Sequence, residues 1–458
     1  MARYEDADFL LSRVSEHRQQ REPWLRRLWS YYRNNVHSVP HGGGIRHATA
    51  QEQGLPERLR EADRELVTEN DIAWRVHALV DFMFGKPVAI RSEAGQPERR
   101  AFIERFLASL FEQSGGVAFL QNMALLGSVY GYVDVLLRVD EDGAAAAGLN
   151  EAEVLASRLR LELVEPPRAV PQTDDEDYRR LVGYAVQRRP GSSGAQGRLE
   201  VWTPEAYRRY YEAEDGSLTA EVSAENVLGR VPVVHIQNLA QPLRYSGLSD
   251  VEPLIPLQDE LNTRLCDRAN RVTFQSFQMY LGKGIEGFTD KPVGPGQMWA
   301  SDNMEASIES FGGDASSPSE EAHLRELRDA MDKMSGVTPI AAGLIRGKVG
   351  NLTSENALRV ILMGTLAKTE KKRVTYGDGL ARVCELALYT LDLMGWYRHP
   401  VSDRKVRLEW PSALPENEEQ VLRNAEVKSS LGVPRERILD ELGYSGSSAG
   451  SSSDSAVN

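Results

Sequence analysis

Cysteine is scarce in this chain, because only Cys266 and Cys384 occur among its 458 residues. Two cysteines so far apart form neither a disulfide framework nor a zinc site, and we interpret both as small core residues in a reducing compartment. No stretch approaches the ~18 apolar residues that cross a bilayer, so no membrane association is expected. The first ten residues, MARYEDADFL, carry acids where a signal peptide has a basic and then an apolar run. Secretion is therefore not expected.

Cations are also in the minority. The chain holds 54 Lys and Arg against 67 Asp and Glu, for a formal net charge of −13. This balance disfavours a protein that clings to nucleic acid, since phosphate binding needs clustered Lys and Arg. It remains compatible with a surface along which DNA slides without adhering. With 41% apolar residues and this length, we expect a folded chain with several structural regions.

The usual enzyme motifs are missing. The segment 343–349 places three residues between its glycines and Val349 after Lys348, whereas a phosphate-binding loop needs four residues and then Ser or Thr. The sequence contains no HExxH motif. The acids Asp174–Asp177 could bind a divalent cation, but we interpret them as a solvated loop. We therefore expect no catalytic residue, no metal and no cofactor.

Apolar periodicity and turn residues divide the chain into helices and strands. Spacings of three and four residues predict helices over 69–84, 98–111, 116–128, 254–277, 319–334 and 353–394, with two short ones before Gly443. Short apolar runs between turn residues predict strands over 88–90, 132–139, 160–164, 181–187, 199–202, 207–212 and 405–410.

The helices predicted over 254–277 and 319–334 flank a short module rich in glycine and aromatic residues. Its large apolar side chains need burial, and we expect a small core of Tyr280, Phe288, Trp299 and Phe311. The apolar stripes of the two helices are too long for this module to cover. We therefore expect neighbouring copies around a closed ring to cover them.

The long helix predicted over 353–394 carries a seven-residue repeat of small and apolar residues, namely Val360, Met363, Ala367, Val374, Gly377, Ala381, Cys384, Leu388 and Leu391. Three glycines lie inside it, and each costs about 1 kcal/mol relative to alanine. We therefore expect bends near Gly364, Gly377 and Gly379.

Residues 339–373 are basic although the chain is acidic. Seven cations stand against two acids there, a local net charge of +5. We interpret this segment as a loop and a helix face close to a DNA backbone. The loop residues are Arg346, Lys348, Val349 and Asn351, and the helix residues are Arg359, Lys368, Lys371, Lys372 and Arg373. The alternative is a solvated helix face or an ion-pair seam between subunits.

Several local patterns in a fixed order resemble one known family. They are Asn70–Pro87, Tyr130–Val135, Val231–His235 followed by Gly247–Asp250, Ser335–Pro339, Asn351–Leu358, Pro415–Glu419 and Leu431–Tyr444. Across about 370 residues, their order and spacing are similar to those of portal proteins of tailed double-stranded DNA bacteriophages, the subunits of head-to-tail connector rings.

The resemblance implies an α+β portal fold with a mixed α/β wing, a two-helix stem, a small α/β clip, a long kinked channel helix and a helical crown. The implied regions are a wing over 1–247, a first stem helix over 248–277, a clip over 278–317, a second stem helix over 318–337, a tunnel loop over 338–352, a channel and wing helix over 353–395, a crown with C-terminal helices over 396–443 and a disordered tail over 444–458.

The resemblance also implies a function and partners. The chain would form a homododecameric conduit for DNA packaging and ejection, located at the portal vertex of the virion and in the host cytoplasm during assembly. Its partners would be other copies of itself, double-stranded DNA, the large terminase, the major capsid and scaffolding proteins and the head-to-tail adaptor. ATP hydrolysis would belong to the terminase, so the chain itself would be no enzyme.

Two other functions remain open at this point. One is a Mg²⁺-dependent DNA-processing enzyme, such as a nuclease, that uses the acids at 174–177. The other is a minor head scaffold that oligomerises without conducting DNA.

Overall fold

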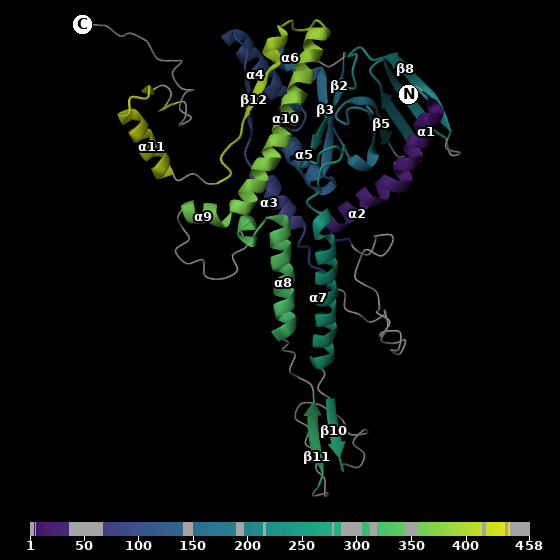
Figure 1. Ribbon diagram of the computed structural model, residues 1–458, viewed down its shortest axis with the longest axis vertical. Helices are drawn as coiled ribbons and strands as arrows, with labels where there is room; N and C mark the ends of the chain where they lie inside the picture. The colour runs from purple at the N-terminus through teal and green to yellow at the C-terminus, as the bar shows by residue number, and fades with distance from the viewer. Residues whose placement is uncertain are drawn as a thin grey trace, which may run out of the picture.

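The chain folds into an α/β body from which two long helices project, with a β-hairpin beyond their far ends (Figure 1). The computed structural model describes residues 4, 6–35, 67–140, 150–188, 197–213, 217–276, 279–284, 305–311, 318–343, 355–414, 418–435 and 438–439.

An N-terminal helical arm runs along one side of the body. It consists of α1 (Ala7–Glu16), a π-helical turn η1 (His17–Arg21) and α2 (Glu22–Tyr32). Asp6 begins α1 by accepting a hydrogen bond from the amide of Asp8 at 3.0 Å. Leu10 and Val14 of α1 are buried against a five-stranded sheet, and Leu25 and Leu28 of α2 are buried in the main core. The arm therefore bridges two cores.

Three consecutive helices contribute to the main core of the body: α3 (Ala73–Phe84), α4 (Pro97–Gln113) and α5 (Gly116–Tyr130). Proline opens α4 at a position where a missing N–H costs least. A short strand, β1 (Ala89–Ser92), links α3 to α4. The main core also takes in the three-stranded sheet and the C-terminal half of α10.

Two antiparallel sheets complete the body. The first has the order β3-β2-β9, from β2 (Tyr132–Val139), β3 (Leu159–Val164) and β9 (Val233–Gln237). Central β2 is buried along most of its length, as its nearly unbroken apolar run requires. The helix α6 (Glu151–Ser157), opened by a capping box of Asn150 and Glu153, connects β2 to β3.

The second sheet is a meander in sequence order, reached through the short turn η6 (Pro166–Arg168). Its strands are β4 (Ala169–Thr173), β5 (Leu181–Arg188), β6 (Gly197–Trp202), β7 (Ala206–Glu212) and β8 (Leu218–Glu225). The sequence predicted β5, β6 and β7 but neither β4 nor β8.

The projecting helices are α7 (Ile255–Ser276), entered through η7 (Glu252–Leu254), and α8 (Pro318–Ser335). They lie side by side, and the ion pair between Arg268 and Glu321 spans 3.7 Å. Beyond them β10 (Met279–Lys283) pairs antiparallel with β11 (Ser307–Phe311). Two long helices around a small module were predicted from the sequence, and the structure confirms them.

The long helix predicted over 353–394 is broken. After η9 (Pro339–Ala342), the chain forms α9 (Glu355–Ile361) and then α10 (Met363–Leu393). Leu362 separates them with φ −90° and ψ 5°, two residues before Gly364. The helix is not interrupted at Gly377 or Gly379, because both residues lie inside the continuous α10. Gly379 instead admits Ile236, whose side chain lies 2.5 Å from where a Cβ would stand.

The end of the described chain returns to the body. Tyr397 stacks on Phe102 with ring centroids 4.0 Å apart, and after η10 (Val401–Arg404) the strand β12 (Val406–Glu409) pairs antiparallel with β1. The strand β12 thus pairs the backbone groups that β1 would otherwise leave unpaired, and the crown predicted over 396–443 stays a prediction. The helix α11 (Glu418–Ser430) follows.

Candidate functional site

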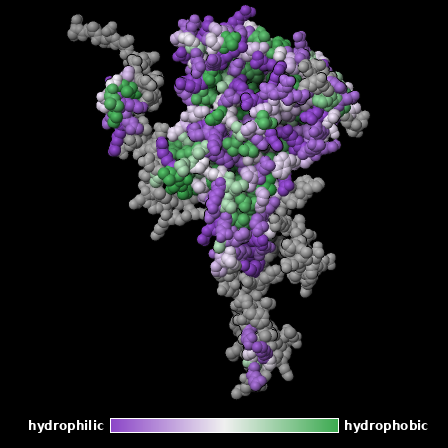
Figure 2. Space-filling model, in the orientation of Figure 1, coloured by the Kyte–Doolittle hydropathy of each residue, from purple (hydrophilic) through white to green (hydrophobic). Residues whose placement is uncertain are grey.

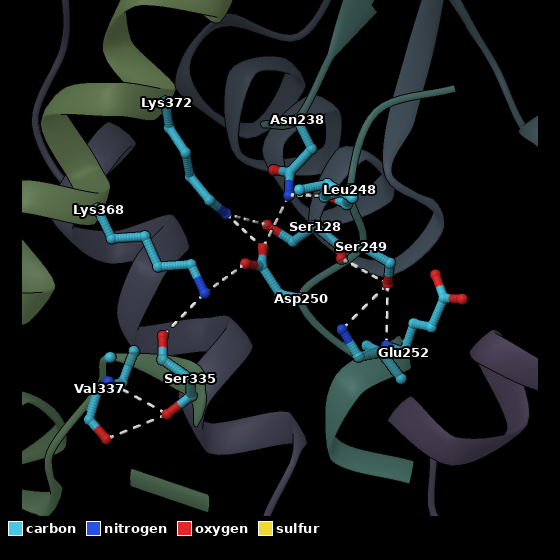
Figure 3. Close-up of polar contacts among 12 residues, drawn as sticks. Ser128, Asn238, Leu248, Ser249, Asp250, Glu252, Ser335, Val337, Lys368 and Lys372 are labelled. Atoms are coloured by element: carbon cyan, nitrogen blue, oxygen red, sulfur yellow. Dashed lines mark hydrogen bonds and ion pairs between the residues drawn. The ribbon is translucent and has the colours of Figure 1, made fainter. Parts of the chain in front are cut away.

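A buried polar cluster marks the point where both projecting helices join the body (Figure 3). Asp250 lies just before η7, and its amide donates to the carbonyl of Ser128 at the end of α5, at 2.8 Å. The neighbouring Ser249 hydroxyl donates to the carbonyl of Val129 at 2.6 Å and accepts from the amide of Val251 at 3.0 Å. Ser249 thus caps the start of η7 and links it to the end of α5.

Two lysines of α10 meet the carboxylate of Asp250. Lys372 Nζ lies 2.5 Å from Oδ2 and donates to the hydroxyl of Ser128 at 2.8 Å. Lys368 Nζ lies 2.7 Å from Oδ1 and donates to the carbonyl of Ser335, at the end of α8, at 2.8 Å. We call Ser128, Asn238, Asp250, Lys368, Lys372 and Tyr376 the lysine hub.

The uncharged members of the lysine hub complete its hydrogen bonds. Asn238 Nδ2 donates to Asp250 Oδ2 and to the carbonyl of Leu248, both at 3.0 Å. The hydroxyl of Tyr376 donates to Asn238 Oδ1 at 3.1 Å. Tyr376 fits because residue 127 is glycine: a Cβ there would stand 1.9 Å from its hydroxyl oxygen.

Burial and charge act against each other inside the lysine hub. Burial by itself would raise the pKa of Asp250, but Lys372 and Lys368 outweigh it and hold that pKa well below its ordinary value. Lys372 is 0% exposed, and burial lowers its pKa although Asp250 acts in the opposite sense. Removing one partner of such a group would leave a buried charge uncompensated.

A second polar cluster holds the chain that leads into the lysine hub. Buried Asp134 accepts hydrogen bonds from the hydroxyls of Tyr184 at 2.8 Å and Tyr245 at 2.9 Å. Its Oδ1 lies 2.7 Å from Nδ1 of His235, whose Nε2 lies 2.6 Å from the carbonyl oxygen of Tyr245. The ring of His235 thus lies between the carboxyl group of Asp134 and the backbone of Tyr245.

A third cluster joins α3 to the end of α8. The buried guanidinium of Arg75 donates to the carbonyl of Asp71 and to the carboxylate of Asp332, and it lies 4.1 Å from the ring centroid of Trp74. Burial raises the pKa of Asp332, and Arg75 opposes that rise. A cavity of about 530 Å³ lies beside these residues. The three clusters together fix the direction of the projecting helices relative to the body.

The structure separates the cations predicted to form one basic helix face. Arg359 and Lys371 are exposed, and Lys368 is half-buried. Lys372 is fully buried, so the prediction that it contacts DNA is corrected. Its ammonium group forms an ion pair with Asp250 of the same subunit. Arg373 donates to the carbonyls of Phe82 and Pro411, and its guanidinium lies 5.3 Å from the ring centroid of Trp410.

Other predicted site residues lie in parts that are described only partly. The loop residues Arg346, Lys348, Val349 and Asn351 fall outside the described residues, as do Phe288 and Trp299. Tyr280 and Phe311 are on the paired strands β10 and β11, one register position apart. The expected small core of the module stays a prediction.

The lysine hub was not predicted from the sequence. Its visible signals were the Gly247–Asp250 motif and two lysines four residues apart, at 368 and 372. Neither signal shows that residues 122 positions apart are partners.

The acids Asp174–Asp177 lie in the described part of the chain. Among the described residues, no group of three or more His, Cys, Asp or Glu side chains is suited to hold a metal ion. Within the same residues, no helix has the length and apolar character needed to cross a membrane.

Comparison with known proteins identifies the family. Two solved structures similar to this chain come from gene transfer agent (GTA) particles. One is described as the virion of the native particle (13% identity, 82% of this chain and 90% of that chain covered, TM-score 0.43). The other is the neck of the empty particle computed with C6 symmetry (12% identity, 82% and 96% covered, TM-score 0.46).

No curated protein sequence matches the chain. The family model described as "Phage portal protein, SPP1 Gp6-like" matches residues 11–443, nearly the whole length. The resemblance found in the sequence motifs is thereby confirmed, together with the α+β portal fold. The chain belongs to the SPP1 Gp6-like family of phage portal proteins.

Proposed function

We propose that copies of this chain assemble head to tail into a ring, dodecameric in the particle, whose central channel conducts double-stranded DNA during packaging and ejection. The observation that carries the proposal is the family match over residues 11–443. A portal protein occupies the vertex between head and tail, so we place the chain in the virion at that vertex.

The shape of the subunit supports a ring. A broad body tapers into two antiparallel helices that lie side by side, α7 and α8, with the β10–β11 hairpin at the tip (Figure 1). Head-to-tail contacts between such wedge-shaped subunits close into a ring when the rotation between neighbours is constant. We assign the body to the wing, α7 and α8 to the stem, the hairpin to the clip, residues 338–352 to the tunnel loop and α9 with α10 to the channel helix.

The distribution of charge supports DNA that is guided without being held. Arg359 and Lys371 are the two exposed cations of the five predicted on the channel helix. Exposed cations attract phosphate weakly and in a salt-dependent manner, while the net charge of −13 limits adhesion elsewhere. We assign these two cations, together with Arg346 and Lys348 of the tunnel loop, to the DNA-facing surface.

The partners follow from the proposed position. The large terminase would dock at the clip during packaging, the head-to-tail adaptor would bind the same end later, and the major capsid and scaffolding proteins would contact the wing. ATP hydrolysis would be carried out by the terminase.

Negative-stain electron microscopy of the purified full chain tests the proposal. Rings with a stain-filled central hole are expected, and monomers or open fibres without rings would contradict it. A scaffold without a conduit would form rings but leave packaging insensitive to reversed charges at Arg359 and Lys371. A nuclease would cleave DNA with Mg²⁺ and lose that activity on Asp174→Asn with Asp175→Asn.

A further inference from the structure

In the first half of α10, the side that faces the body is polar and the side that faces away from it carries exposed apolar residues. Its buried side carries polar residues: Thr365, Thr369, Lys372 and Tyr376 are all buried. Met363 and Val374 are 67% and 72% exposed, and Ala367 between them is exposed as well. At about 100° per residue, the two sets lie on opposite sides of the helix, about 170° apart. A helix in an isolated subunit places its apolar residues inside, so this one has a second partner.

The apolar residues form an ordered stripe. Met363, Ala367 and Val374 are members of the seven-residue repeat whose later members, Cys384, Leu388 and Leu391, are buried in the core of this subunit. The same repeat is therefore covered by the body at its C-terminal end and bare at its N-terminal end. The spacings from Val360 to Val374 are three, four and seven residues, with exposed Glu370 at the position between Ala367 and Val374. Such spacings keep side chains on one face of a helix, where another helix can pack.

The helix before the break extends the stripe. Val360 of α9 is 72% exposed, and α9 turns away from the axis of α10 at Leu362 (Figure 1). A helix of seven residues is not stable in water by itself, so α9 also needs a surface to pack on. Figure 2 shows hydrophobic side chains gathered where α9 meets the first turns of α10. We call Val360, Met363, Ala367 and Val374 the outer stripe.

We infer that the outer stripe is the surface on which the neighbouring copy of this chain packs in the ring. The inference rests on the proposed function and deepens it. A head-to-tail ring buries two different surfaces of every subunit, and one of them must be an apolar surface left bare in the single chain. Exposed Glu370 and Lys371 lie on the two sides of the stripe and form a polar rim that stays open to solvent. Such a core within a rim is typical of a specific protein interface.

A double substitution tests the contact. Met363→Asp with Val374→Asp places two charges on the stripe, and we expect the purified chain to elute as a monomer in size-exclusion chromatography with light scattering. The matched control is Val401→Asp, since Val401 is 69% exposed on the body, in η10. The control should form rings as the unsubstituted chain does. Circular dichroism and the melting temperature should be the same in all three proteins.

Thiol protection gives a second readout that does not depend on disrupting the ring. Both native cysteines are buried, so Val374→Cys adds the one accessible thiol among the described residues. We expect maleimide to label that position at least ~10-fold more slowly in rings than in dissociated subunits. Val401→Cys should label at the same rate in both.

The outcomes separate the two proposals. Rings from the unsubstituted chain and from the double aspartate variant would overturn the assignment of the outer stripe and leave the proposed function standing. Fast labelling of Val374→Cys in rings would show a stripe open to the channel or to another protein, and slow labelling in monomers a stripe covered by the same chain. Either result overturns the inference. An unsubstituted chain that never forms rings overturns the proposed function and this inference with it.

Discussion

The ammonium of Lys372 and the carboxylate of Asp250 are 122 residues apart in the chain, yet they lie 2.5 Å apart with both side chains buried. Lys372→Met removes the closer cation and leaves the carboxylate of Asp250 with Lys368 and the amide of Asn238. Because a buried carboxylate loses its closest partner, we expect the free energy of unfolding to fall by about 3 kcal/mol. Urea denaturation followed by circular dichroism measures this loss.

The adjacent lysine supplies the control for this substitution. Lys371→Met changes the same side chain at an exposed position and should stay within about 0.5 kcal/mol of the unsubstituted protein. Equal losses from the two substitutions would mean that the buried ion pair adds nothing to stability.

Asp250 also predicts a dependence on pH. A carboxyl whose pKa is lower in the folded state stabilises the fold at pH values above its unfolded pKa, near 3.8, and that stabilisation is lost as the pH falls toward the folded pKa. The unsubstituted protein should therefore exceed Asp250→Asn in stability at pH 6. This advantage should narrow by about 1 kcal/mol at pH 3. Urea denaturation of both proteins at the two pH values gives the difference, and an equal difference at both would argue against the assignment.

Gly127 and Tyr376 should be coupled. Gly127→Ala places a Cβ 1.9 Å from the hydroxyl oxygen of Tyr376, and we expect a loss of about 2 kcal/mol from overpacking. In Tyr376→Phe the hydroxyl is gone, so adding Gly127→Ala should then cost less. Thermal denaturation of the two single variants and the double variant measures the coupling energy. Gly95→Ala is the control, because no atom lies within 4 Å of the added Cβ.

The exposed cations of the channel helix predict an effect on DNA. In a packaging assay with the cognate terminase, Arg359→Glu with Lys371→Glu should preserve rings while packaged DNA falls by roughly tenfold, because attraction to phosphate becomes repulsion. Lys405→Glu reverses an exposed charge on the body and should package normally. Normal packaging by the double variant would exclude these two residues from the DNA-facing surface.

Local patterns in the sequence predicted most of the helices. The predicted spans of α4 and α7 agree with the structure within two residues at each end, since a long apolar stripe identifies a helix without outside information. The strand β4 was not predicted because it contains Pro171, and proline within a run argues against a strand. The strand β8 was not predicted because most of its residues are exposed. Its sequence therefore lacks the alternation of apolar and polar residues that marks a half-buried strand.

The lysine hub shows where such reasoning stops. A local count of charge identified residues 339–373 as basic, but it does not distinguish the side of α10 that faces Asp250 from the side that faces outward. That distinction depends on the packing of α5, α7 and α8 around the helix. Lys372 was therefore assigned to DNA when its partner is a carboxylate of the same subunit.

The start of α7 and the end of α8, the two projecting helices, meet at one side chain. Lys368 touches Asp250, where the chain leaves for α7, and the carbonyl of Ser335, where it returns from α8. The two projecting helices and the hairpin thus leave the body and rejoin it at the same point. The fold of the body therefore does not depend on their length. Evolution can therefore lengthen, shorten or exchange the tip while the rest of the subunit is inherited unchanged.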